Sequence, residues 1–255
     1  MGPLAPPLPT FLIIGAQKSA TRWLRLNLGL HPEVFTAAKE LEFFNNGPRY
    51  RDDGTDWYRA QFDGWAGEAI VGEATPGYMF WRHRPVTVSE RIDETLPGVR
   101  LIATLRNPID RAQSAMVHHM EFGALPPDSV LMDYVKSVEP EKDRLGIITG
   151  GWYAASLEPY YERFGDRLLV VLHDDVDDDA RGVYDAALRH VGASTDFVPP
   201  EFERVRFSLQ QKASSEPGRR PLTLDERRRL WEFYADDVAA VEKMLGRDLS
   251  IWSPG

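Results

Sequence analysis

The segment that most constrains the fold is residues 11–24, which reads FLIIGAQKSATRWL. Its apolar start is typical of a short strand buried on both faces, and this strand is expected to end at Gly15. After a loop that carries Lys18, a helical pattern begins at about residue 20. A strand that leads through a short loop into a helix is the unit from which parallel α/β sheets are built.

The loop around Lys18 has the chemistry of an anion site. Backbone N–H groups at a helix start point at a bound anion, the helix dipole favours negative charge, and a lysine adds a full positive charge. The loop is not a Walker A motif, G-x-x-x-x-G-K-S/T, because Lys18 follows Gly15 by only three residues and Gln17 precedes it. The sequence therefore predicts a phosphate-binding turn of another kind.

A second candidate anion site follows the apolar stretch 99–105. Arg106 comes at the carboxyl end of this expected strand, where open α/β sheets bind ligands. Asn107 is placed to cap the next helix, and Arg111 and Ser114 share a face of that helix with it. A guanidinium with a hydroxyl suits a phosphate monoester. A structural alternative, in which Arg106 and Arg111 pair with acidic neighbours, remains open, but the Lys18 loop favours the anion site.

Strand-like and helix-like segments alternate along the rest of the chain. This order predicts an α/β fold: a single-domain parallel β-sheet flanked by helices, over residues 10–255, after a flexible N-terminal segment 1–9. The expected strands are 11–15, 70–73, 99–105 and 167–172, and the expected helices cover about 20–30, a stretch from 107, 152–164, 180–191 and 224–245. Two loop-rich regions, 40–67 and 194–221, are expected to carry binding chemistry.

Charge and composition exclude several classes of function. The formal net charge of −9 argues against nonspecific binding of nucleic acid or of an acidic membrane. The absence of cysteine excludes disulfides, thiolate catalysis and cysteine-based zinc sites. No signal peptide and no apolar run of roughly 18 residues is found, so we expect no membrane partner and a cytoplasmic location.

Taken together, these segments resemble the sulfotransferases that use 3′-phosphoadenosine 5′-phosphosulfate (PAPS). The likeness is to the branch with bacterial small-molecule enzymes and heparan-sulfate sulfotransferase domains, and it spans about residues 10–245. Each motif alone is weak, but six occur in the family's order. They are GAQKSATR at 15–22, KELEFF at 39–44, EATPGY at 73–78, LRNP through Ser114 at 105–114, the G-x-Y helix and following strand at 151–176, and GRRP at 218–221.

The resemblance implies a P-loop-like nucleotide-binding sulfotransferase fold, PAPS as donor with 3′-phosphoadenosine 5′-phosphate (PAP) as product, and no metal. It implies that the 5′-phosphosulfate is held by Lys18, Ser19, Ala20, Thr21 and Arg22. It also implies that the rest of the nucleotide is held by Arg106, Ser114, Tyr153, Gly218, Arg219 and Arg220. In the family a hydroxyl, or less readily an amine, attacks sulfur in line, so the implied enzyme is a PAPS-dependent sulfotransferase.

Glu40 matches the family's carboxylate base, and Lys18 suits the charge that develops on the leaving phosphate. Glu42 stands where relatives have His or Gln, so two carboxylates share one face of an extended segment. Three roles are open for Glu42: repulsion that raises the pKa of one of the two carboxylates, binding of a cationic acceptor, or a solvated loop acid. His118 is either an alternative base or a surface or packing residue. Ala74 replaces a lysine of the heparan-type relatives, which argues against a polysaccharide acceptor.

The acceptor itself is expected to be a small molecule, of the kind found in secondary metabolism. Implied acceptor contacts are Glu42, Phe44, Thr75, Tyr78 and His118. Aromatic residues in the loops at about 45–67 and 78–92 indicate an aromatic or apolar acceptor: Tyr50, Trp57, Tyr58, Trp65 and Trp81. The sequence does not determine the oligomeric state.

Two rival functions remain open. A P-loop kinase would need a complete Walker A loop and an acidic magnesium ligand at a strand end, and the segment 103–106 (ATLR) supplies no acid. A noncatalytic nucleotide-binding protein of the same fold would have lost the catalytic groups. Intact Lys18, Glu40, Arg106 and Ser114 argue against that reading, while Ala74 is its best support.

Overall fold

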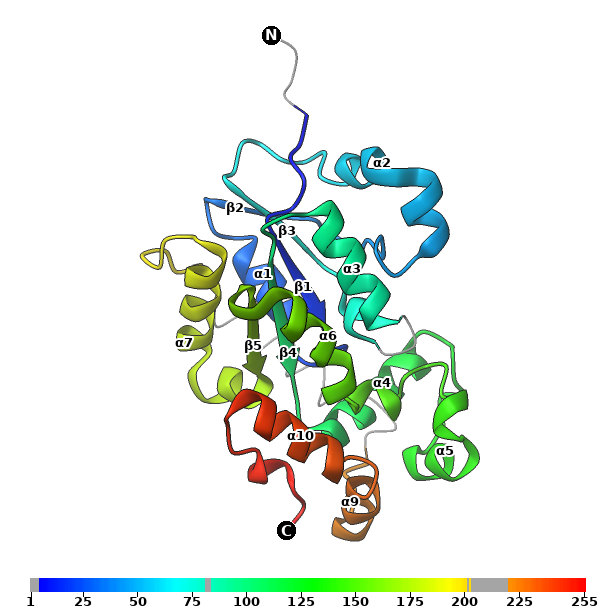
Figure 1. The fold of residues 1–255 in the computed structure, drawn as a ribbon. Coiled ribbons are helices and arrows are strands. Elements are labelled where there is room, and N and C mark those ends of the chain that lie inside the picture. Colours follow the sequence, from blue (N-terminus) through cyan, green and yellow to red (C-terminus); the bar gives the residue numbers. More distant parts are fainter. Residues whose placement is uncertain (1–4, 81–83, 201, 203–219) are drawn as a thin grey trace.

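The computed structural model describes residues 5–80, 84–200, 202 and 220–255. Its strands form one five-stranded sheet in the order β2-β3-β1-β4-β5, and every neighbouring pair is parallel (Figure 1). The strands are β1 (Phe11–Gly15), β2 (Val34–Thr36), β3 (Ile70–Ala74), β4 (Arg100–Leu105) and β5 (Leu168–Leu172). The predicted α/β fold, a single parallel sheet flanked by helices, is confirmed.

The helices lie between and after the strands. The α-helices are α1 (Thr21–Leu28), α2 (Gly54–Ala60), α3 (Pro85–Thr95), α4 (Pro108–Glu121), α5 (Leu131–Ser137), α6 (Ala154–Phe164), α7 (His173–Val191), α9 (Leu224–Trp231) and α10 (Ala235–Leu245). Short 3₁₀ or π segments are η1 (Arg49–Asp53), η2 (Pro76–Met79), η4 (Pro140–Lys142), η5 (Thr149–Gly151), η6 (Gly165–Arg167) and η7 (Ser250–Trp252).

Two apolar clusters cover the two faces of the sheet. On β1, Phe11 and Ile13 pack with α1 and α7, whereas Leu12 and Ile14 pack with α3, α4, α6 and α10. All four side chains are fully buried. Alternate residues of one strand therefore enter opposite cores, as the continuous apolar run of a doubly covered parallel strand requires.

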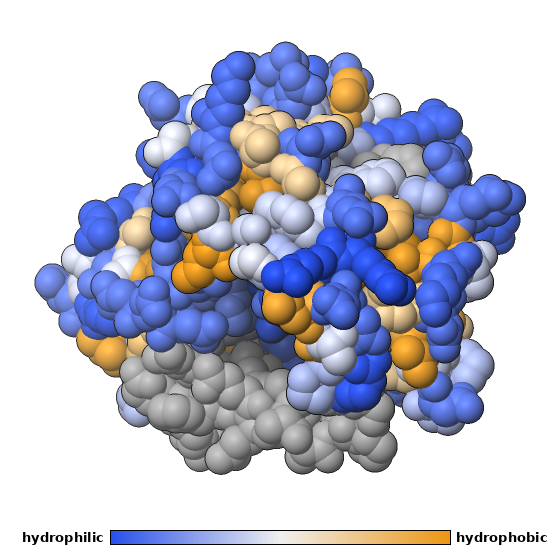
Figure 2. Space-filling model, turned by 90° about the horizontal axis from the view of Figure 1, so that it is seen from below, coloured by the Kyte–Doolittle hydropathy of each residue, from blue (hydrophilic) through white to orange (hydrophobic). Residues whose placement is uncertain are grey.

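The parallel register brings the carboxyl ends of the central strands to one edge of the sheet, the lower edge in Figure 1. The ladder continues past the strands: Ala16 N donates to Thr104 O over 2.7 Å, and Thr75 N donates to Ile13 O over 3.0 Å. Figure 2 looks onto the molecule from that side and shows a mostly hydrophilic surface with separate hydrophobic patches. The loops that follow β1, β3 and β4 therefore begin side by side at this edge.

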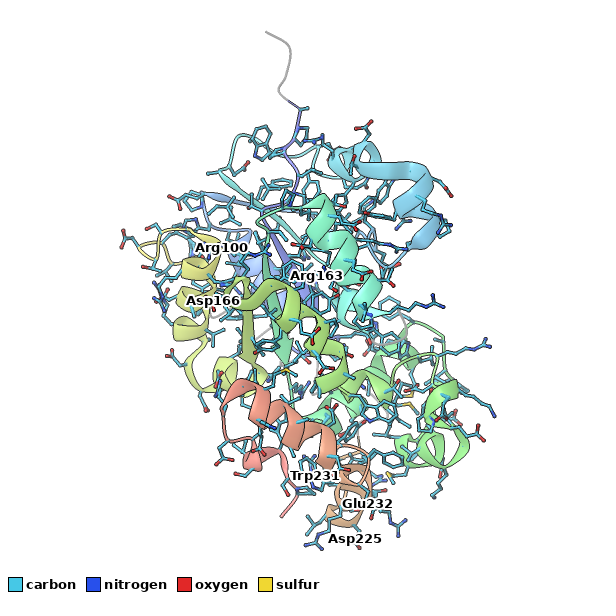
Figure 3. The ribbon with its side chains drawn as sticks, in the orientation of Figure 1. Arg100, Arg163, Asp166, Asp225, Trp231 and Glu232 are labelled. Carbon is cyan, nitrogen blue, oxygen red and sulfur yellow. The ribbon has the colours of Figure 1, made fainter. Side chains whose placement is uncertain are left out.

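An ion pair between α6 and α3 lies near the opposite end of the sheet. Figure 3 places Arg100, Arg163 and Asp166 there, far from Asp225 on α9. Arg163 pairs with Glu90 over 3.6 Å, which joins α6 to α3. Such partly exposed pairs contribute about 0–1 kcal/mol each, so the buried apolar contacts, not these charges, hold α3 against α6.

The C-terminal helix predicted over 224–245 is two helices, so this prediction was wrong. Thr223 and Glu226 form a capping box at the start of α9. The chain then breaks before α10 and buries Tyr234, whose hydroxyl donates to Ile148 O over 3.0 Å. Asp237 in the next turn accepts the N–H groups of Tyr153 and Ala154, which begin α6. These distant partners, rather than local periodicity, set the break.

Other predicted boundaries differ by a few residues. The helix expected from residue 180 begins at His173, and its backbone leaves helical geometry at Asp179. The Asp179 carboxylate accepts the N–H of Gly182 over 2.8 Å, as an N-cap does. The sequence thus predicted the second part of α7 and missed the first. Strand β2 and helices α2, α3 and α5 were not predicted.

Gly72 is required where β3 passes β1. It pairs with Phe11, and a Cβ at residue 72 would lie 2.2 Å from a carbon of the Phe11 ring. We expect Gly72→Ala to lower the free energy of unfolding by about 1–3 kcal/mol, the usual cost of overpacking a core. Chemical denaturation measures this change. Adding Phe11→Leu to Gly72→Ala should restore part of the lost stability. Phe11→Leu alone is the control. If Gly72→Ala is as stable as the wild type, the account is contradicted.

Candidate functional site

The loop between β1 and α1 leaves backbone amides available at its helix start. Lys18 and Ala20 have left-handed backbones, with φ of 69° and 71°, and α1 begins directly afterwards at Thr21. The N-cap residue Ala20 has no side chain that could bond the first amides of α1. An anion at this helix start would accept those N–H groups, so the loop predicted from the sequence has the expected form.

Ser19 supplies a buried hydroxyl without a hydrogen-bond partner in the described structure. Its side chain is fully buried, and its Oγ accepts and donates no hydrogen bond. It lies near the hydroxyl of Tyr153, which already donates to the carbonyl of Arg106 over 2.8 Å. Burial raises the pKa of Tyr153 to about 12, so that this hydroxyl remains a donor. An unsatisfied buried hydroxyl is costly, and an anion in the loop would satisfy it.

Arg106 joins the two predicted anion elements. It follows β4, which pairs with β1, and its Nη1 lies 3.4 Å from the carbonyl oxygen of Lys18. Asn107 caps α4 as predicted, with Oδ1 accepting the N–H of Ile109 over 3.0 Å. Ser114, partly buried, lies two turns along α4. The structure therefore brings the Lys18 loop and the Arg106 element together at one edge.

The C-terminal part of the predicted nucleotide site is only partly described. Gly218 and Arg219 lie outside the described residues. The carbonyl of Arg220 accepts a hydrogen bond from Gln113 of α4 over 2.7 Å, which places this end of the loop beside Ser114. The Arg220 guanidinium, however, bonds both carboxylate oxygens of Glu226, at 2.8 and 2.5 Å, and this pairing lowers the pKa of Glu226 to about 2.

Arg111 has a structural role. It is fully buried and donates to the carbonyls of Gly146 and Ile147. Asp143, also buried, accepts three backbone N–H groups of the same loop, those of Ile147, Ile148 and Thr149, over 2.8 to 3.1 Å. These two charged side chains shape the loop that forms one pocket wall. Sequence analysis missed Asp143, because nothing local distinguishes it from a solvated loop acid.

Two pockets adjoin the Lys18 loop. The larger, of about 210 Å³, is lined by Ala16, Gln17, Glu40, Glu42, Pro76, Gly77, Met79, Phe80, Arg111, His119, Arg144, Leu145, Gly146, Gly150 and Ser156. The smaller, of about 170 Å³, is lined by Thr21, Arg22, Arg25, Ala38, Lys39, Glu40, Ala74 and Pro76. Glu40 and Pro76 line both pockets. The predicted base therefore lies where the two spaces meet, beside the helix start that carries the anion loop.

The surroundings shift the pKa values of the two candidate bases, Glu40 and His118, in opposite directions. Burial raises the pKa of Glu40, Glu42 adds to this, and Arg25 opposes it. Part of the Glu40 residue is exposed to solvent, but the protein atoms around its carboxyl group disfavour the charged form, and this raises its pKa. Burial, with Lys18 and His119 as further causes, lowers the pKa of His118 to about 4. His118 is thus a weak proton acceptor, and in the described structure its neighbour His119 lines the larger pocket.

Four residues expected to contact the acceptor, Phe44, Thr75, Tyr78 and His118, do not line either pocket. Phe44, Thr75 and Tyr78 are fully buried. Tyr58, one of the aromatic residues expected near the acceptor, stacks on Phe43 in the interior, with ring centroids 4.4 Å apart. Phe80 is the aromatic side chain that the larger pocket does contain among the described residues. Motif order placed these residues near the site but could not show which side chains face inward.

A buried carboxylate, that of Glu73, lies next to the segment that follows Glu40. Glu73, in β3, is fully buried and accepts hydrogen bonds from the hydroxyls of Tyr78 (2.6 Å), Thr75 (2.7 Å) and Tyr58 (3.1 Å). Burial raises its pKa from 4.5 to about 7, even though the three hydrogen bonds act in the opposite direction. The sequence signal for such a group is an acid inside an apolar strand segment, IVGEA.

The raised pKa of Glu73 predicts a pH dependence of stability. An acid whose pKa is higher in the folded chain stabilises the fold below its unfolded pKa of 4.5, and this stabilisation is lost as pH rises through 7. The shift corresponds to roughly 3 kcal/mol. Between pH 4.5 and 8, the free energy of unfolding of the wild type should fall relative to that of Glu73→Gln by about this amount, measured by denaturant titration. Parallel pH curves for the two proteins would contradict it.

In the part of the chain that the structure describes, no group of three or more His, Cys, Asp or Glu residues is placed to hold a metal ion. No helix in residues 5–80, 84–200 or 220–255 is long and apolar enough to cross a membrane.

Comparison with known proteins gives consistent matches. A family model described as "Sulfotransferase domain" matches residues 8–214. A sulfotransferase structure from Alicyclobacillus acidocaldarius superposes with a TM-score of 0.78 at 29% identity, covering 96% of this chain and 98% of that one. A mouse sulfotransferase complexed with PAP superposes with a TM-score of 0.56 at 13% identity, covering 94% of this chain and 90% of that one, and shows the same fold.

Curated relatives match over a shorter stretch. The membrane-associated sulfotransferase kil1 of Dictyostelium discoideum is 35% identical over 111 residues, 42% of this chain and 22% of the relative. The heparan sulfate glucosamine 3-O-sulfotransferase 5 of Homo sapiens is 34% identical over 114 residues, 45% of this chain and 32% of the relative. The chain thus covers less than a third of the length of these two relatives.

Proposed function

The chain belongs to the sulfotransferase domain family, and from that premise we propose that it transfers a sulfuryl group from PAPS to a hydroxyl, or less readily an amine, of a small-molecule acceptor. The observation that carries the proposal is the buried, unpartnered Ser19 hydroxyl in a helix-start loop that also contacts Arg106. Hydroxyl, helix-start amide and guanidinium groups are the kinds of donor that bind phosphate and sulfate groups in proteins.

The residues present fit the donor. Amides at the start of α1, with Lys18, Ser19 and Arg22, would hold the 5′-phosphosulfate, and Arg106 with Ser114 would hold the 3′-phosphate. When bound, PAPS supplies an activated sulfuryl group on a phosphate leaving group. The chain carries a net charge of −9, so these cations form a local positive site in an acidic protein.

Glu40 is the proposed general base. The acceptor hydroxyl forms a new O–S bond as the bond between sulfur and the phosphate oxygen breaks, and its proton passes to the Glu40 carboxylate. Lys18 offsets the negative charge that grows on the leaving phosphate oxygen. The raised pKa of Glu40 favours this role, because a base with a pKa closer to neutral pH accepts a proton more readily.

The larger pocket supports a compact acceptor with an apolar body. Met79, Phe80 and Leu145 supply its apolar wall, and Glu42 with Arg144 supplies charged groups at its rim. A volume of about 210 Å³ has room for a small acceptor group. A panel of alcohols and amines incubated with labelled donor would identify the acceptor class.

Donor binding separates this function from its rivals. By calorimetry, PAP should bind without magnesium and ATP should bind poorly. Ser19→Ala should weaken PAP binding about 10-fold, because a hydrogen bond to a charged group is worth about 1.5 kcal/mol. The same change should leave stability unchanged or raised, since it removes an unsatisfied hydroxyl.

Ser89→Ala is the matched control for Ser19→Ala. Ser89, on α3, is equally buried, but its hydroxyl donates to Val86 O over 2.8 Å. It should lose stability and keep PAP affinity. Strong magnesium-dependent ATP binding would support the kinase instead, and full PAP affinity in Ser19→Ala would remove Ser19 from the site.

Turnover tests the catalytic proposal. Glu40→Gln should retain PAP affinity while kcat falls about 10²- to 10⁴-fold, the usual contribution of a general base. Steady-state transfer of labelled sulfate to the best acceptor of the panel measures this. If the variant turns over like the wild type, Glu40 is not the base, and a wild type that binds PAP but transfers nothing would support a noncatalytic nucleotide-binding protein.

A further inference from the structure

We propose that Glu73 is a positioning residue: through the hydroxyls of Thr75 and Tyr78 it fixes the backbone of residues 41–43, and so holds Glu40 and Glu42 at the pockets. The inference rests on the proposed function, because it assigns how the proposed base is held. No motif of the sequence gives Glu73 this role.

The contacts begin at the carboxylate. Glu73 Oε2 accepts the hydroxyl of Thr75 over 2.7 Å, and Oε1 accepts those of Tyr78 over 2.6 Å and Tyr58 over 3.1 Å. All four side chains are fully buried, so water does not compete for these bonds. A carboxylate is an acceptor only, and each hydroxyl has a single proton to donate. Both oxygens of Glu73 therefore fix the direction in which these protons point.

The hydroxyl oxygens must then act as acceptors on their other side. Thr75 Oγ1 accepts the N–H of Leu41 over 3.0 Å and that of Glu42 over 3.3 Å. The Tyr78 oxygen accepts the N–H of Phe43 over 3.2 Å. The backbone N–H groups of three successive residues after Glu40 are thereby held by the hydroxyls of Thr75 and Tyr78. Protonation of Glu73, or its replacement by glutamine, would add a donor and turn at least one hydroxyl away from its amide.

The held segment has a conformation that needs such support. Glu42 has a φ of 50°, in the left-handed region that residues with a Cβ avoid. Such a backbone persists where surrounding contacts determine it. Four hydrogen bonds supply these contacts. Three come from the backbone N–H groups of residues 41–43, and the fourth runs from Arg49 Nη1 to Leu41 O over 2.7 Å. Glu40 and Glu42 both line the larger pocket as a result.

The network is fixed to the same strands as the donor loop. Glu73 in β3 pairs with Leu12 of β1, the strand that ends in the Lys18 loop. The titratable groups that face Glu73 are Tyr58 from α2, Tyr78 from η2 and, at longer range, Glu40. Burial and the nearby carboxylate raise the pKa of both tyrosines well above 10, so they remain donors throughout the working range. The paired strands β1 and β3 therefore fix the position of the proposed base relative to the proposed donor site.

A pair of tyrosine variants tests the proposal. Tyr58→Phe and Tyr78→Phe each remove one hydroxyl bonded to Glu73 Oε1, and both rings are fully buried. Only the Tyr78 hydroxyl also holds an amide of residues 41–43. Tyr78→Phe should lower kcat at least about 10-fold with PAP affinity within about twofold, because small misplacements of reacting groups are costly. Tyr58→Phe should lower kcat much less than Tyr78→Phe does, because the Tyr58 hydroxyl holds none of these amides.

Threonine variants provide a second, milder test. Thr75→Val keeps the shape but removes the hydroxyl that holds Leu41 and Glu42, so kcat should fall with PAP affinity unchanged. Thr75→Ser keeps the hydroxyl and should restore turnover. Equal losses of kcat in Tyr58→Phe and Tyr78→Phe, or wild-type kcat in Thr75→Val, would overturn the proposal.

Hydrogen exchange separates this inference from the proposed function. Amides of residues 41–43 should exchange at least about 10-fold faster in Tyr78→Phe and Thr75→Val than in Tyr58→Phe and the wild type. This readout needs no turnover. Faster exchange without any sulfuryl transfer in the wild type would leave the positioning role intact and reject the function, whereas unchanged exchange in both variants would reject the positioning role alone.

Discussion

The hydrogen-bonded ladder on both sides of β1 is the constraint on which the rest of the site depends. It continues beyond the strands, from Ala16 N to Thr104 O and from Thr75 N to Ile13 O, at 2.7 and 3.0 Å. The anion loop, the Arg106 element and the Thr75 segment therefore start from fixed positions at one edge of the sheet. Because the proposed donor site and the segment that follows Glu40 are both attached to this edge, their separation is set by the sheet and not by flexible loops.

Charge is arranged at this edge in two layers. Cations at Lys18 and Arg106 lie next to the start of α1, where they would meet an anionic donor. Beneath the acceptor side, the Glu73 carboxylate is held by hydroxyls, without an ion pair within the described residues, and its pKa is raised to about 7. Ionised Glu73 costs stability but orients its donors, which is the compromise expected of a group that serves a site rather than the fold.

Much of the fold, and the contact between the two elements of the proposed donor site, could be predicted from the sequence. The strand 11–15 matches β1 residue for residue, and the cap at Asn107 is present, because both depend on local pattern. Contact between the Lys18 loop and Arg106 follows from the rule that parallel strands end at one edge. The resemblance to sulfotransferases is confirmed by the family match. What the sequence could not show depends on distant partners: the α9–α10 break at buried Tyr234, the loop organised by Asp143, and the burial of Thr75 and Tyr78.

The central claim is that this edge binds a doubly phosphorylated adenosine so that its sulfuryl group faces Glu40. The most direct measurement is a crystal structure of the protein with bound PAP. The account predicts the 5′-phosphate on the amides that begin α1, within hydrogen-bond distance of Ser19 Oγ, and the 3′-phosphate on Arg106 and Ser114. A nucleotide bound elsewhere, or a 5′-phosphate that leaves the Ser19 hydroxyl without a partner, would contradict it.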